Sequence, residues 1–221
     1  MPISLLVLIL LVFLGIPTLI RLGFFSVEWR LSLLFLVFVA FAIWGFSTLS
    51  PLAMGFTNAD LVRGLLPWSV ATLLMLLGML VAAVILRQKH AEGLSRDLHF
   101  LFLFIPISAV QQFIYQSVLL QKLLLGLDPW LAIAICGLCF GYMHTIFPRR
   151  LHNFMLATLG GILFSSLFYF YPNFLLAAAS HMILNFVAVY LGFFTLLTSD
   201  GKPRATRLPF ARLRKTTPGD F

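Results

Sequence analysis

Residues 67–86 read PWSVATLLMLLGMLVAAVIL, twenty consecutive positions without a charged side chain. At 1.5 Å per residue, a helix of this length covers the roughly 30 Å hydrocarbon core of a bilayer. The whole chain is 61% hydrophobic and 10% charged, whereas a soluble domain is about half apolar and a quarter charged. Lipid allows only helices or closed barrels, and the alternation of a barrel strand is absent. The sequence therefore predicts an all-α, polytopic bundle of membrane helices.

Working outward from this stretch, further apolar runs predict seven spans in all. They cover residues 3–20, 31–49, 67–86, 99–121, 129–147, 152–171 and 173–197. An eighth span could lie as a half-helix near residues 50–65. Pro106 predicts a kink or break in the fourth span, because proline removes a helical hydrogen bond. We expect the first run to be a retained helix rather than a signal peptide, since no basic segment precedes it.

The distribution of charge predicts the orientation. With the N-terminus outside, thirteen Lys and Arg residues fall in inside segments, and only Arg63 and Lys122 fall outside. Basic residues gather on the cytoplasmic side of membrane proteins. We therefore expect an integral protein of the cell (inner) membrane with a cytoplasmic C-terminus. The net charge of +8 then reflects topology and contact with membrane lipid, and it does not indicate nucleic-acid binding.

Strongly polar residues recur inside three of the spans. Span four carries Gln111, Gln112 and Gln116, span five carries His144, and span seven carries His181 and Asn185. An intramembrane polar group is costly and is by default a candidate for function. The pairs 112/116, 140/144 and 181/185 are spaced i,i+4, so each pair shares one helix face. We expect the three faces to meet in a common interior, although His144 is predicted to lie nearer the cytoplasmic end than His181.

The segment CGLCFG, residues 136–141, allows two interpretations. Gly137 and Gly141 form a small-residue pattern typical of close helix packing. Cys136 lies two turns before His144, so a Cys/His metal site can be drawn. Two histidines and an asparagine are a poor ligand set for zinc, however. We favour packing and expect no metal and no cofactor.

Three short patterns together resemble a known family. QQFIYQ at 111–116, FGYMH at 140–144 and HMILN at 181–185 are similar to the motifs of the CPBP intramembrane proteases. This family contains the type II CAAX prenyl endopeptidases and bacterial relatives linked to bacteriocin immunity. Its motifs are Glu-Glu-x-x-x-Arg, Phe-x-x-x-His and His-x-x-x-Asn. The resemblance covers about residues 100–195.

The resemblance implies specific roles. In the family a glutamate activates water for attack on a peptide carbonyl, histidines assist, and the last asparagine stabilises the oxyanion with a histidine. By position, Gln111 and Gln112 stand where the glutamates belong, and Gln116 stands where the arginine belongs. The other three, His144, His181 and Asn185, match without change.

The glutamines change the expected chemistry. A primary amide does not titrate near neutral pH and cannot serve as the general base that water attack needs. The seven carboxylates of the chain are all expected in loops, tails or span ends: Glu28, Asp60, Glu92, Asp97, Asp128, Asp200 and Asp220. We therefore predict that the chain is inactive or strongly impaired as a protease, either as a natural pseudoenzyme or as a redesigned variant.

Two functional hypotheses follow. In the first, the chain is a CPBP-family intramembrane endopeptidase that cleaves membrane-associated peptides, with the impairment just described. In the second, it is a non-catalytic pseudoprotease that binds a membrane peptide or a lipid-linked (lipidated) protein. A transporter is a weaker third hypothesis, because the spans hold no charge for ion coupling. We expect three parts: N-terminal transmembrane helices at 1–98, the motif-bearing core at 99–198 and a basic tail at 199–221.

Overall fold

The structure is a computed structural model that describes residues 3–24, 30–58, 61–86, 98–146, 150–191, 193, 196–197 and 203–204. Within these ranges it is a bundle of helices, which confirms the predicted class. The first rods are α1 (Ile3–Leu8), η1 (Ile9–Gly15) and α2 (Ile16–Arg21), then α3 (Arg30–Thr48) and α4 (Leu61–Ile85). The later rods are α5 (Leu98–Gln112), η4 (Phe113–Leu120), α6 (Gln121–Leu124), α7 (Pro129–Met143), η5 (His144–Ile146), α8 (Arg150–Phe170) and α9 (Phe174–Tyr190). A two-residue antiparallel pairing joins β1 (Leu196–Leu197) to β2 (Pro203–Arg204).

In the described part of the chain, three helical stretches are long enough and apolar enough to cross a membrane: Leu61–Ile85, Pro129–Ile146 and Leu151–Phe170. Shorter apolar helices occupy Leu5–Arg21, Ser32–Thr48 and Phe174–Tyr190. Many large apolar side chains along these rods are exposed, as expected for a surface that faces lipid. The basic tail lies outside the described residues, apart from Pro203 and Arg204.

Two expectations about individual helices need correction. The region near 50–65 holds no separate half-helix in its described part. Residues 51–55 form a turn, and α4 begins at Leu61 with Pro67 inside it. Likewise α5 continues through Pro106 without a break. Neighbouring helices and local adjustments satisfy the backbone groups that proline frees, so membrane helices tolerate it.

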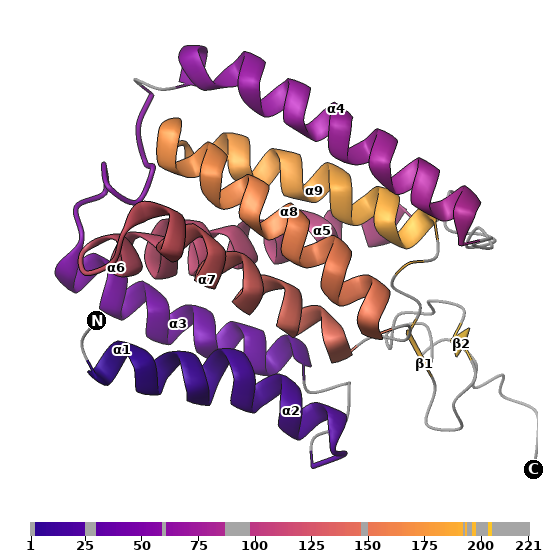
Figure 1. Ribbon diagram of the computed structural model, residues 1–221, viewed down its shortest axis with the longest axis horizontal. Coiled ribbons are helices and arrows are strands. Elements are labelled where there is room, and N and C mark those ends of the chain that lie inside the picture. Colours follow the sequence, from indigo (N-terminus) through magenta and orange to yellow (C-terminus); the bar gives the residue numbers. More distant parts are fainter. Residues whose placement is uncertain are drawn as a thin grey trace, which may run out of the picture.

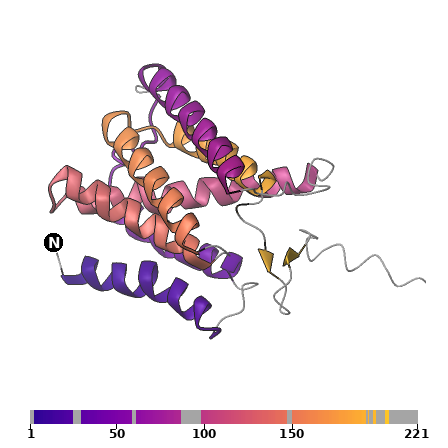
Figure 2. The same ribbon diagram turned by 45° about the vertical axis from the view of Figure 1, so that its right-hand side comes forward.

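The rods form layers, which Figure 1 and Figure 2 show from two directions. The helix α4 lies along one edge, and α1 and α3 lie along the opposite edge. Between them, α9 packs against both α4 and α5, while α7 packs against α8. The interior is aromatic, with Phe13, Phe41, Tyr115 and Phe140 buried in one cluster. This arrangement places α9 at the centre of the motif-bearing half.

The contact between α7 and α8 depends on glycine. A methyl group on Gly141 would overlap Thr158 Oγ1 and would lie 2.9 Å from the Phe154 carbonyl oxygen. A methyl group on Gly137 would lie 2.8 Å from the backbone nitrogen of Ile162. The two backbones therefore approach closely, as the small-residue pattern predicts.

The start of α9 is fixed by the turn that precedes α4. Asn173 caps α9, because its Oδ1 accepts a hydrogen bond from Leu176 N at 3.0 Å. Its Nδ2 donates to the Thr57 carbonyl at 2.9 Å, and Phe174 N donates to the Gly55 carbonyl at 3.0 Å. Gly55 has a φ of 82°, a conformation that favours glycine. A segment far from the motifs in sequence thus sets the position of the helix that carries two motif residues.

Candidate functional site

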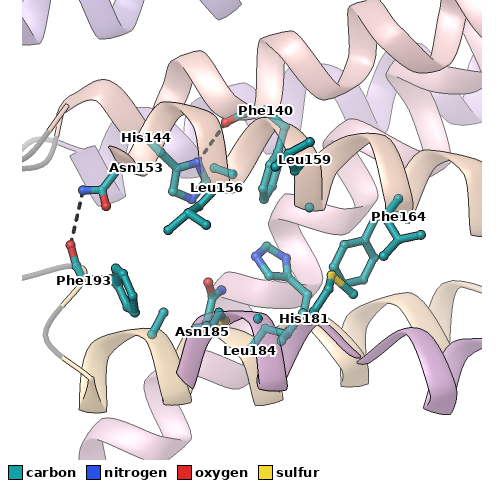
Figure 3. A pocket seen from close by; sticks show the side chains of 17 residues that line it. Phe140, His144, Asn153, Leu156, Leu159, Phe164, His181, Leu184, Asn185 and Phe193 are labelled. Carbon is teal, nitrogen blue, oxygen red and sulfur yellow. Dashed lines mark hydrogen bonds between the residues drawn. The ribbon is translucent and has the colours of Figure 1, made fainter. Parts of the chain in front are cut away.

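A cavity of about 260 Å³ lies between α4, α7, α8 and α9 (Figure 3). Most of its wall is apolar. The polar side chains that line it are His144 from α7 and η5, Asn153 from α8, and His181 and Asn185 from α9. Three of the four are motif residues of the resemblance. A mostly apolar pocket with a few convergent polar groups is typical of a binding or active site.

The rings of both histidines contact the ring of Phe140. The His144 ring centroid is 4.7 Å from that of Phe140, and the His181 ring centroid is 5.3 Å from it. His144 Nδ1–H donates to the Phe140 carbonyl at 2.8 Å, so in the neutral ring the lone pair is on Nε2. The predicted difference in depth therefore does not keep the two histidines apart, because both of their rings contact the one ring of Phe140.

Gln112 determines which ring nitrogen of His181 carries the proton. Its Nε2 lies 2.7 Å from His181 Nδ1. An amide nitrogen only donates, so Nδ1 accepts and the neutral ring carries its proton on Nε2. A glutamate at the same place could only accept when ionised, and it would draw the proton to Nδ1 instead. Glutamine at position 112 therefore leaves His181 with a donor, and not a basic nitrogen, to offer a ligand.

Asn185 is tied to α5. Its Nδ2 donates to Ser108 Oγ at 3.1 Å and to Gln111 Oε1 at 3.4 Å. The amide nitrogen of Asn185 is thus directed toward α5, and its carbonyl oxygen is the atom that can face His181 and the cavity. An oxyanion requires donors, so this orientation suits an acceptor role better.

Gln116 lies further along, inside the π-helical segment η4, where every residue is buried. It is 0% exposed, and neither of its amide atoms has a hydrogen-bond partner among the described residues. Segments of π-helix are frequent at functional sites. The structure therefore joins Gln111 and Gln112 to the histidine and asparagine, whereas it gives Gln116 no polar contact within the described chain.

The carboxylates and cysteines do not approach the cavity in the described part of the chain. Asp128 is the one acid that the structure describes, and it caps α7 by accepting from Trp130 N at 2.9 Å. The other six acids lie outside the described residues. Cys136 is buried and donates to the Tyr115 carbonyl at 3.2 Å. No group of three His, Cys, Asp or Glu that could hold a metal occurs within the described ranges.

Sequence reasoning missed three residues of this site. Ser108 accepts from Asn185, and its place one turn before the glutamines was the available signal. Asn153 lines the cavity and is 2% exposed, yet a lone asparagine near a helix start gives no pattern. Phe193 also lines the cavity, and an aromatic residue in an apolar run carries no signal at all.

Comparison with known proteins identifies the region. Residues 95–187 match the family model described as type II CAAX prenyl endopeptidase Rce1-like. The match covers somewhat less than half of the chain and contains all six candidate residues. Comparisons with curated proteins and with solved structures found no match. Residues 95–187 of this membrane helix bundle are therefore similar to the type II CAAX prenyl endopeptidase, Rce1-like, family.

Proposed function

We propose that this protein keeps the substrate-binding cavity of a CAAX-protease-like membrane protein but has lost the general base. It binds a membrane-associated peptide or a lipidated protein and cleaves it extremely slowly or not at all. In this proposal His144, His181 and Asn185 contact the bound peptide group, and Gln111 and Gln112 position them. We also propose that the protein is in the cell membrane with a cytoplasmic C-terminus, and that the basic residues of the tail bind anionic lipid.

The bond between Gln112 Nε2 and His181 Nδ1 at 2.7 Å carries this proposal. It supports a non-catalytic role because the group beside the histidine cannot take a proton from water. The engaged amide of Asn185 supports the same conclusion, since the hydrogens that would stabilise an oxyanion already have acceptors.

The polar side chains of the cavity offer both kinds of hydrogen-bonding partner to a neutral peptide group. His181 Nε2–H can donate, and Asn185 Oδ1, which also interacts with His181, can accept. A peptide group has one N–H and one C=O, so it can satisfy both kinds of partner. A carboxylate or phosphate would meet acceptors with no cation to balance its charge among the residues that line the cavity.

The cavity also has a side that a lipid-borne chain could use. Gly78 of α4 and Gly160 of α8 both line it, and a methyl group on either would meet nothing within 4 Å. Leu159 beside Gly160 is exposed on the lipid-facing surface. An apolar segment of a membrane-associated ligand could therefore reach the polar groups between α4 and α8 without passing through water.

Cleavage and binding should be measured together. The unmodified protein and the variant Gln111→Glu/Gln112→Glu/Gln116→Arg are assayed on a panel of membrane-tethered fluorogenic peptides, with binding followed by photocrosslinking. We expect binding without cleavage in the unmodified protein, and cleavage faster by about 10²–10⁴-fold in the restored variant, the usual contribution of a general base. Cleavage by the unmodified protein that His144→Ala abolishes would overturn the loss of function. Failure of the restored variant to cleave any peptide would remove the support for a protease ancestry of the site.

A further inference from the structure

Asn153 and Phe193 meet at one end of the cavity, outside the three sequence motifs. Asn153 Nδ2 donates to the Phe193 carbonyl at 3.2 Å. Both side chains line the cavity, and they are 2% and 4% exposed. Figure 3 shows them at the end that also holds His144, with Phe164 at the opposite end.

Both backbone groups of Phe193, the N–H and the C=O, make hydrogen bonds. Its N–H donates to the Ala188 carbonyl at 2.9 Å, and its C=O accepts from Asn153. The ring belongs to a small buried cluster with Ala83 of α4 and Leu191, separate from the main core. The Asn153 bond therefore joins α8 to a residue beyond the end of α9, and the ring closes the space between α4 and α9.

We propose that Phe193 is an end wall that keeps bulk water out of the cavity, and that Asn153 is the positioning residue that holds this wall in place. The inference goes beyond the proposed function because it concerns access of water, whatever ligand the cavity binds. Excluding water strengthens each hydrogen bond that His144, His181 and Asn185 make to a ligand.

The contacts that hold Phe193 in place are weak enough for this wall to open at times. Among the described residues, Phe193 is held, apart from the bond to Asn153, by one backbone hydrogen bond and by contacts with small or flexible apolar side chains. Replacing Asn153 with leucine keeps the side-chain size but leaves the Phe193 carbonyl without this donor. Losing one buried hydrogen bond shifts an opening equilibrium by about fivefold to tenfold.

Thiol labelling tests the inference. A cysteine is introduced as Ala157→Cys, a position that lines the cavity, while the native Cys136 and Cys139 are buried and set the background. The protein, held in lipid nanodiscs, is treated with a water-soluble, membrane-impermeant methanethiosulfonate. We expect labelling at position 157 to be slow, and to become about fivefold to tenfold faster with Asn153→Leu and at least as fast with Phe193→Ala.

A matched control variant distinguishes opening of the cavity to water from a simple increase in cavity volume. Phe164→Ala removes the same ring from the opposite end of the same cavity, so it creates space without removing the wall, and labelling should stay slow. Phe193→Ala keeps the backbone acceptor of Asn153, so it tests the ring even if Asn153→Leu fails to fold. Unchanged labelling in Phe193→Ala, or equal acceleration by Phe164→Ala, would overturn the proposal.

Discussion

Two helix interfaces position the side chains that line the cavity, and they are built differently: α7 packs on α8, and α5 packs on α9. The first is built on Gly137 and Gly141, where a methyl group has no room. The second is built on amide hydrogen bonds that join Gln112 to His181 and Asn185 to Ser108. Close backbone packing fixes where the helices lie, and the amide bonds fix which hydrogen each polar group presents. The fold and the chemistry of the site therefore depend on different residues and can be disturbed separately.

The largest effect is expected where the packing is tightest. Gly141→Ala places a methyl group against Thr158 Oγ1 and 2.9 Å from a backbone oxygen that cannot rotate away. We expect the free energy of unfolding to fall by about 3 kcal/mol, at the upper end of overpacking effects. Titration with denaturing detergent in mixed micelles measures this loss. A variant as stable as the unmodified protein would show that α7 and α8 do not pack on glycine.

The two buried glutamines offer the sharpest test of the other interface. Gln112→Leu leaves His181 Nδ1 without its donor and should cost about 1–3 kcal/mol of stability. Gln116→Leu, the same change one turn later, removes two polar atoms that lack partners within the described chain, so it should be neutral or stabilising. The same detergent titration compares them. Equal losses of unfolding free energy in the two variants would mean that the hydrogen bond from Gln112 to His181 does not stabilise the protein.

A smaller effect is expected at the start of α9. Asn173→Ala removes a helix cap and the bond to the Thr57 carbonyl, so the unfolding free energy should fall by about 1 kcal/mol. Because α9 carries His181 and Asn185, ligand crosslinking should fall as well. Asn173→Asp keeps the capping oxygen and should recover most of the stability, which separates the cap from the bond to Thr57. Full loss in both variants would assign the effect to Thr57 instead.

The smallest effect is expected at Gly160. Gly160→Ala adds a methyl group where nothing lies within 4 Å, and alanine is favoured over glycine in a helix by up to about 1 kcal/mol. We expect a slight gain in unfolding free energy, which also makes this variant the matched control for Gly141→Ala. A clear loss at Gly160 would contradict the difference between the packed and the open faces of these helices.

The sequence predicted the helices well because a bilayer imposes length and apolarity on each span. Five of the seven predicted spans agree at both ends with a helix of the structure to within about three residues, whereas the seventh was drawn to residue 197 although α9 ends at Tyr190. The fourth extends to Leu124. The start of α4 was placed too late, because Arg63 and Pro67 resemble a boundary although membrane helices accommodate both.

The site was only partly predictable. The spacing of His181 and Asn185 places them on one face, and that is a local property of a helix. The direction of the Asn185 amide depends on Ser108, and the closure by Phe193 depends on Asn153. Both are contacts between distant segments that no single-sequence pattern encodes. The family match supports the region, whereas the role of each glutamine remains a prediction.

The position of one proton tests the central claim most directly. Nitrogen-15 labelling of histidine, with His181→Gln to assign the signal among the five histidines, reports which ring nitrogen of His181 carries hydrogen at neutral pH. We predict a neutral ring with its proton on Nε2 in the unmodified protein, and transfer of that proton to Nδ1 in Gln112→Glu. A proton on Nδ1 of His181 in the unmodified protein would contradict the account, because a basic Nε2 would then face the cavity.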